Sequence, residues 1–212
     1  MANFKELAQA IIDGNRKSVA ELTGRALDEG ASPTDILSKG LQTGMAEIGR
    51  RFREGECYVP EVLLAARAMH AGLDVLRPKL AETGMPIIGK VVIGTVAGDL
   101  HDIGKNLVAM MLEGAGFDVV DLGIDVPIDK FVAAVKEHSP QVVGMSALIT
   151  TTMPAMKQVI AAMGDAGVRS KVKVIVGGAP VTSEYAKQIG ADGYGASAGE
   201  AVEVCKSLIG AR

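Results

Sequence analysis

Aromatic residues, cysteines and long apolar runs are all scarce in this chain, and each shortage excludes certain classes of function. Aromatic side chains make up 3% of the 212 residues and there is no tryptophan, so a stacking platform for single-stranded nucleic acid is not expected. No apolar run approaches the ~20 residues needed to span a bilayer. The two cysteines, Cys57 and Cys205, have no CxxC spacing and fit a reducing compartment.

Charge and the N-terminal residues add two further exclusions. The net charge is −3 and no cluster of Lys and Arg stands out, so we expect neither nucleic acid nor a membrane as a partner. The first residues lack the charged-then-apolar layout of a signal peptide. These features predict a cytoplasmic globular protein with room for one large domain or two small ones.

Residues 1–86 carry helical signals. Ser32 and Pro33 are residue types typical of an N-cap and of the first helical position. Val59 opens another helix, in which apolar residues recur at three- and four-residue steps as far as Leu80. Roughly four helices with short connections predict a small bundle.

Residues 87–212 have a different period. Short β-branched apolar runs alternate with helical patterns, and this alternation predicts an α/β domain with a doubly wound parallel sheet. In such sheets, ligands bind outside the carboxyl ends of the strands. We predict strands over 90–96, 118–122, 142–146 and 172–176, and helices near 104–115, 128–138, 153–166, 182–190 and 198–209.

Three motifs follow predicted strands and should therefore share one edge of the sheet. Asp99-x-His101 follows the first strand, Ser146 ends the third, and Gly177-Gly178 follow the fourth. His101 could ligate a metal through one ring nitrogen. Asp99 could then bind the other nitrogen, fix the tautomer and raise the basicity of the ligand.

Each motif also has an ordinary structural explanation. A lone loop histidine is more often structural than a ligand. Paired glycines often only make a tight turn, although they also let a ligand lie against the backbone. The hydroxyls of Ser146 and of residues 150–152 could cap the next helix. Residues taken one at a time leave these alternatives open.

Other enzyme motifs fail on context. Residues 84–91 nearly spell a phosphate-binding loop, but they lack the final Ser or Thr and precede a strand instead of following one. There is no G-x-S-x-G elbow for a serine hydrolase. His101-Asp102 superficially matches the HD phosphohydrolases, which need further histidines and carboxylates that this chain does not supply.

The ordered set Asp99-x-His101-x-x-Gly104, Ser146-x-Leu148 and Gly177-Gly178 resembles the signature of corrinoid-binding proteins. These include the methyl-carrier subunits of corrinoid-dependent methyltransferases and the cobalamin module of methionine synthase. The resemblance covers most of the chain and implies a flavodoxin-like (Rossmann-like) order of strands. It also implies that cobalamin or a related corrinoid is the cofactor.

The resemblance assigns roles to individual residues. It implies that His101 is the lower axial ligand of the cobalt, that Asp99 is its hydrogen-bond partner, and that Thr152 is the third member of this relay. Asp102 and Gly104 complete the cofactor-binding loop. A slot for the nucleotide tail of the cofactor is implied at Ser146, Leu148, Thr150, Gly177 and Gly178, with Ala196 closing it.

The helical half resembles the cap that covers the upper face of the cobalt. Phe52 and Val59 match the two residues placed over the methyl group, although on burial statistics alone both could be bundle core. We expect this cap to swing aside about a linker at 82–90 when a partner enzyme needs access.

No residues equipped to activate a methyl donor or acceptor are present, so we predict a non-catalytic methyl carrier. The resemblance implies three partners: a donor-specific methyltransferase, a second methyltransferase acting on tetrahydrofolate or a thiol, and a reductive activase. The alternatives are the cobalamin-binding subunit of an adenosylcobalamin mutase, which generally lacks the cap, and a cobalamin sensor, which would carry a DNA-binding domain. A flavodoxin-like protein without a corrinoid is a third.

Overall fold

The computed structural model describes residues 2–83 and 87–211, except for the side chains of 81–83. The chain divides into two compact units. One runs to Ile87 and includes Gly114–Gly116, and the other comprises Ile88–Glu113 and the chain from Phe117 onward. The linker predicted at 82–90 contains residues 84–86, which lie outside the described residues.

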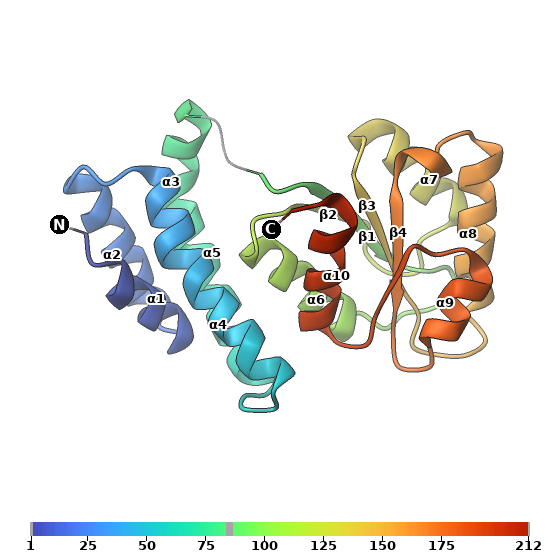
Figure 1. The fold of residues 1–212 in the computed structure, drawn as a ribbon, viewed down its shortest axis with the longest axis horizontal. Coiled ribbons are helices and arrows are strands. Elements are labelled where there is room, and N and C mark those ends of the chain that lie inside the picture. Colours follow the sequence, from blue (N-terminus) through green and yellow to red (C-terminus); the bar gives the residue numbers. More distant parts are fainter. Residues whose placement is uncertain (1, 84–86, 212) are drawn as a thin grey trace. The chain divides into compact units, whose positions relative to one another are not determined.

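The helical unit has four helices in its described part (Figure 1). One of them is continuous over residues 33–53 and contains a π-helical segment, a local widening that the periodicity did not predict. The elements are α1 (Phe4–Ile12), α2 (Arg16–Asp28), α3 (Pro33–Asp35), the π segment (Ile36–Leu41), α4 (Gln42–Arg53) and α5 (Val59–Thr83).

Local chemistry sets the ends of these helices. The Ser32 hydroxyl accepts the backbone N–H of Asp35, as the sequence predicts for an N-cap. At the start of α5, the backbone N–H of Tyr58 donates to the Glu61 carboxylate at 3.0 Å, which is half of a capping box. The apolar faces then pack into a core that includes Leu7, Ile11, Ile36, Leu41, Ile48, Met69, Leu76 and Leu80.

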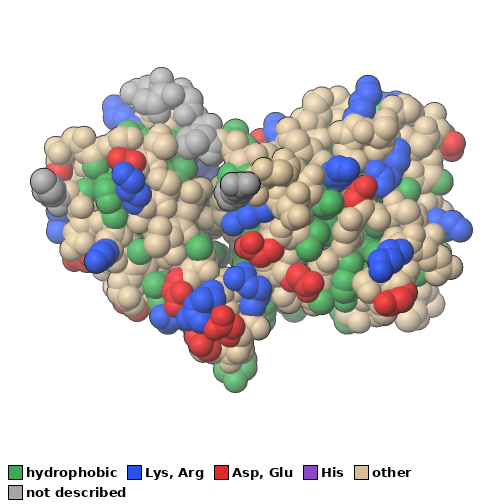
Figure 2. All heavy atoms as spheres, in the orientation of Figure 1, with side chains coloured by type: hydrophobic (Ala, Val, Ile, Leu, Met, Phe, Trp, Pro, Cys, Tyr) green, Lys and Arg blue, Asp and Glu red, His purple; other side chains and the backbone are tan. Residues whose placement is uncertain are grey.

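An ion-pair network ties the end of α4 to the turn that precedes α5. Arg50 bonds Glu47 at 2.8 Å and Glu56 at 2.9 Å, and it also pairs with Glu54. Hydrogen bonds from Arg50 and then Arg51 lower the pKa of Glu47 to about 2. Side chains of both signs are mixed over the molecular face shown in Figure 2.

The second unit is a five-stranded parallel sheet in the order β2-β1-β3-β4-β5, which confirms the predicted flavodoxin-like arrangement. Helices α6 and α10 cover one face, and α7, α8 and α9 cover the other (Figure 1). The strands are β1 (Lys90–Thr95), β2 (Asp118–Asp121), β3 (Val142–Ser146), β4 (Lys173–Gly177) and β5 (Gly193–Gly195).

The helices of this unit lie within two residues of the predicted positions. The edge strand β5 was not among the four predicted runs, because Gly-Tyr-Gly has no apolar pattern of its own. The helices are α6 (Ile103–Gly114), α7 (Ile128–His138), α8 (Pro154–Asp165), α9 (Ser183–Ile189) and α10 (Ala198–Ile209), with a 3-10 turn at Arg169–Lys171.

Large side chains bury one face of the sheet beneath α7 and α8. Phe131, Met156 and Met163 are fully buried there. Gly94 in β1 makes room for the Phe131 ring, since a Cβ at Gly94 would lie 2.9 Å from it. In the described part of the chain, no helix is long and apolar enough to cross a membrane.

Candidate functional site

The carboxyl edge of the sheet brings the predicted motifs together. In the strand register, Thr95 pairs with Ser146, Ser146 with Gly177, and Gly177 with Gly195. The loops after β1, β3 and β4 therefore start from neighbouring positions in one row. Segments about 80 residues apart in the chain meet here because parallel strands end on the same side.

Asp99 and His101 form a close pair in the loop after β1. The Asp99 side chain is 0% exposed, and its Oδ1 lies 2.7 Å from Nδ1 of His101. The same oxygen accepts the backbone N–H of His101 at 3.1 Å. The His101 side chain is 52% exposed. With Nδ1 engaged inside the protein, Nε2 is the ring nitrogen left to meet a ligand.

The second oxygen of Asp99 meets the loop after β3. Oδ2 accepts the backbone N–H of Leu148 at 2.8 Å and lies 2.7 Å from the Thr152 hydroxyl. That hydroxyl is also 2.8 Å from the carbonyl of Ile149, and its single proton goes preferentially to the charged carboxylate. The structure thus brings together the three residues of the predicted relay, His101, Asp99 and Thr152.

These hydrogen bonds control the ionisation of Asp99. Burial by itself raises the pKa of a carboxyl group, because it penalises the charged form. For Asp99 the hydrogen bonds from Thr152, Leu148 and His101 outweigh that penalty and lower the pKa below its ordinary value. Asp99 is therefore a buried carboxylate that stays charged and holds the His101 ring through a charge-assisted hydrogen bond.

Exposed apolar side chains occur on both loops of the site. Leu100 is 67% exposed and Ile103 is 74% exposed, on either side of the His101-Asp102 pair. Leu148 and Ile149, after β3, are 43% and 40% exposed. Leu148 was predicted as a site residue and the others were not. The sequence signal that could have identified the others is an apolar residue at a position where neither a strand pattern nor a helix pattern calls for one.

The predicted glycines differ in what requires them. Apart from its chain neighbours and the backbone of its own helix, a Cβ on Gly104 would meet nothing within 4 Å, so packing within the chain does not demand a glycine there. A Cβ on Gly178 would lie 1.9 Å from the carbonyl oxygen of Ala147, and its φ is +122°. At Gly177 a Cβ would lie 3.0 Å from the Gly195 carbonyl. Close backbone packing accounts for this glycine pair without a ligand.

The remaining predicted residues have less specific surroundings. The Asp102 carboxylate accepts the Asn106 side-chain amide at 3.0 Å at the start of α6. Thr150 and Ala196 are exposed, and the backbone N–H of Ala196 donates to Glu200. Phe52 and Val59 lie in the helical unit, at the end of α4 and the start of α5, and both are partly exposed.

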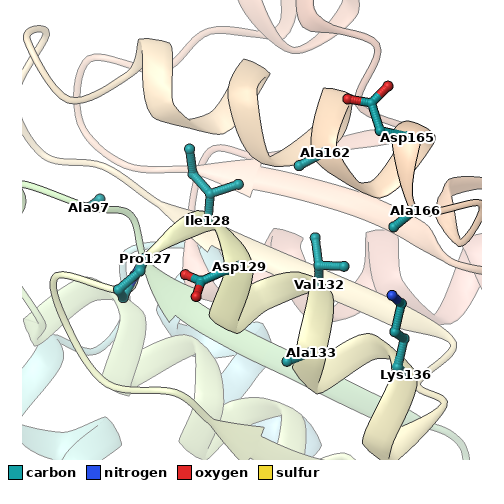
Figure 3. A pocket seen from close by; sticks show the side chains of 10 residues that line it. All are labelled: Ala97, Pro127, Ile128, Asp129, Val132, Ala133, Lys136, Ala162, Asp165 and Ala166. Carbon is teal, nitrogen blue, oxygen red and sulfur yellow. The ribbon is translucent and has the colours of Figure 1, made fainter.

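An open groove of about 920 Å³ lies between α7 and α8 (Figure 3). Ala97 and Pro127 lie toward one end of it, and Lys136 and Asp165 toward the other. None of the predicted site residues lines this groove. The loop surface that carries the predicted residues is therefore separate from this groove.

Comparison with known proteins defines the class. Residues 89–203, more than half of the chain, match the family model of the B12 binding domain, and residues 4–77 match a second model with the same description. The trimethylamine corrinoid protein of Methanosarcina barkeri is 46% identical over 99% of both chains. The chain belongs to the family of B12-binding corrinoid proteins, and its cofactor is a corrinoid.

Two solved structures share this architecture at 33% identity. A cobalamin-binding protein from Desulfitobacterium hafniense DCB-2 matches over 98% of this chain and 99% of its own, with a TM-score of 0.81. The methanol:cobalamin methyltransferase complex of Methanosarcina barkeri contains a chain that matches over 99% of this chain and 80% of its own, with a TM-score of 0.87.

The residues at the sheet edge fit a corrinoid. A half-exposed imidazole with its inner nitrogen already bound presents one nitrogen to a metal. The apolar side chains of Leu100, Ile103 and Leu148 suit the face of a large macrocycle. Gly104 leaves open space where a Cβ would otherwise stand.

Proposed function

We propose that this chain carries a methyl group between two methyltransferases, with His101 as the lower axial ligand of the corrinoid cobalt. When bound, the corrinoid supplies the chemistry, since its cobalt can accept a methyl group from one partner and give it to another. The observation that supports this role most directly is the His101–Asp99 pair, a half-exposed imidazole held at 2.7 Å by a fully buried carboxylate.

The chain's own residues would hold and orient the ligand. Asp99 keeps the Nδ1 proton and the ring direction, and Thr152 with the Leu148 amide keeps the Asp99 carboxylate in place. A proton at Nε2 would prevent ligation, because a doubly protonated imidazole has no acceptor nitrogen. The network therefore links the protonation of the His101 ring to its capacity to ligate.

The predicted tail slot and cap belong to the same proposal. Ser146, Thr150, Gly177, Gly178 and Ala196 would line or close the slot for the nucleotide tail. Phe52 and Val59 would help to exclude water from the methyl group, since exclusion of water protects a reactive centre. The match of residues 4–77 to a B12-binding model supports a cofactor role for the helical unit.

We further propose that a methylated amine is the original methyl donor and that a donor-specific methyltransferase delivers the methyl group. The 46% identity to a trimethylamine corrinoid protein supports the amine, and the likeness to a methyltransferase complex supports the partner. The acceptor enzyme would act on tetrahydrofolate or a thiol, and a reductive activase would restore oxidised cobalt. Methylation of the reduced, loaded chain by trimethylamine methyltransferase but not by its methanol counterpart would support the donor, and the reverse would reject it.

The ligand is tested by the ultraviolet-visible spectrum of the chain reconstituted with hydroxocobalamin. We expect stoichiometric uptake and a spectrum that changes in His101→Ala. His138→Ala, which alters a histidine at the end of α7, is the matched control and should behave as the wild type. Uptake with a spectrum that His101→Ala leaves unchanged would remove His101 as the ligand, and absence of uptake would reject cobalamin as the corrinoid that this chain binds.

A further inference from the structure

A side chain outside the loop holds the backbone of His101. The Thr95 hydroxyl donates to the carbonyl oxygen of His101 at 2.9 Å. Thr95 is the last residue of β1 and is 0% exposed, so its hydroxyl is a buried polar group with this carbonyl as partner. A β-branched residue at the end of a strand suggests only sheet packing, which is why sequence reasoning did not select it.

The support under this hydroxyl is rigid. The backbone N–H of Thr95 donates to the Gly123 carbonyl at 3.0 Å, and its carbonyl accepts the N–H of Val126 at 3.0 Å. On the other side, Thr95 is in register with Ser146 of β3. Backbone hydrogen bonds and strand pairing on both sides therefore fix the position of the Thr95 side chain.

The hydrogen bond from Thr95 complements the one from Asp99. Asp99 holds the N–H of His101 at 3.1 Å, while Thr95 holds its carbonyl. The two peptide groups that flank the His101 Cα are thus both fixed. The carbonyl of Asp99 is in turn bound by the Asp125 N–H at 3.0 Å. Without Thr95, the peptide group after His101 would lose its side-chain partner.

We infer that Thr95 is a positioning residue for the axial ligand: by fixing the His101 carbonyl, it fixes the direction in which Nε2 points. That this direction serves to bind cobalt rests on the proposed function. That Thr95 fixes the backbone of His101 is independent of the cofactor. One hydrogen bond changes an equilibrium by about two- to tenfold, so this is the change expected in the ratio of ligated to unligated His101.

The test uses three variants of the full chain. Thr95→Val removes the hydroxyl and keeps the shape, and Thr95→Ser keeps the hydroxyl. Thr23→Val is the matched control, because the Thr23 hydroxyl is also buried but has no hydrogen-bond partner in the described part of the chain. All three are loaded with cob(II)alamin at one fixed pH, and electron paramagnetic resonance measures the signal split into triplets by one axial nitrogen.

We expect Thr95→Val to lower the ratio of ligated to unligated species about two- to tenfold. Thr95→Ser and Thr23→Val should stay at the wild-type ratio. A wild-type ratio in Thr95→Val would overturn the inference, and so would a loss of the triplet signal in Thr95→Ser. The serine variant keeps the inference testable if the valine variant does not fold.

A second measurement needs no cofactor and separates this inference from the proposed function. Hydrogen exchange of the His101 amide reports whether the loop backbone is held, and we expect it to be about two- to tenfold faster in Thr95→Val alone. If His101→Ala leaves the axial nitrogen signal intact, the proposed ligand is wrong and amide exchange decides the role of Thr95. Equal exchange in Thr95→Val and the wild type would then overturn it.

Discussion

The two halves of the carboxyl edge are built in different ways. After β1, hydrogen bonds dominate: Asp99 accepts from Leu148, from Thr152 and from His101. Along β4 and β5, glycines and close backbone contacts dominate, as at Gly178. We call the loop after β1 the polar half and the region along β4 and β5 the glycine half. The polar half fixes the direction in which one ring nitrogen of His101 points, and the glycine half fixes the shape of the backbone. Substitutions in the two halves should therefore fail for different reasons.

The largest effect on stability is expected in the glycine half. Gly178→Ala would place a Cβ 1.9 Å from the Ala147 carbonyl oxygen at a φ of +122°. Relief of that overlap requires a backbone shift in addition to the conformational strain, so we expect the free energy of unfolding to fall by about 3–5 kcal/mol. Urea denaturation followed by circular dichroism measures it.

Gly190→Ala is the control that separates strain from overlap. Gly190 has a φ of +79°, and a Cβ there would meet nothing within 4 Å. Only the left-handed conformation is penalised, at about 1–2 kcal/mol. Equal losses in the two variants would mean that close packing is not the reason for Gly178.

In the polar half, Asp99→Asn should lower the free energy of unfolding by about 2–4 kcal/mol, because every hydrogen-bond donor around the Asp99 side chain points toward its carboxylate oxygens. Oδ1 receives donors from His101, and Oδ2 receives them from Leu148 and Thr152. Whichever way the amide turns, its NH₂ group faces other donors. Urea denaturation at pH 7 measures the loss, and Asp165→Asn, at an exposed position of α8, should change nothing.

The pH dependence of this loss identifies its origin. Folding lowers the pKa of Asp99, so the carboxylate stabilises the fold above the ordinary value of about 4. As pH falls below that value, the stabilisation declines by about 1.4 kcal/mol per pH unit. The gap between the wild type and Asp99→Asn should therefore shrink on acidification. A gap that widens would show that Asp99 is not held as a carboxylate.

The smallest effect on stability is expected at Gly104, near the start of α6. Because a Cβ there meets no protein atom, Gly104→Ala should leave stability unchanged or raise it by up to about 1 kcal/mol. If the open space belongs to the corrinoid, the same variant should bind hydroxocobalamin about tenfold less tightly, as one mismatched contact of ~1.4 kcal/mol would cause. Titration followed by absorbance measures the affinity.

Gly164→Ala in α8 is the matched helix substitution, since a Cβ there also meets nothing within 4 Å. It should gain similar stability and bind hydroxocobalamin as the wild type does. Unchanged affinity in Gly104→Ala would place the cofactor away from the start of α6.

Much of the fold was accessible from local patterns. The N-cap at Ser32 and the start of α5 at Val59 follow from residue types that satisfy backbone groups within one turn. Apolar runs located four of the five strands, and the fifth escaped because Gly-Tyr-Gly becomes a strand only by pairing with β4. Likewise, nothing in the local sequence pattern indicates the π-helical segment of residues 36–41.

The sequence by itself determined that His101 and a nearby carboxylate would follow a buried strand at the ligand-binding edge of a parallel sheet. Only the tertiary structure decided which partners they have. Strand pairing places Leu148 and Thr152 on Asp99, and the turn of the loop after β1 places the His101 carbonyl on the Thr95 hydroxyl. The physical reason is that periodicity reports which face of an element is buried. A hydrogen bond between residues 49 or 53 positions apart depends instead on the order and register in which strands pair.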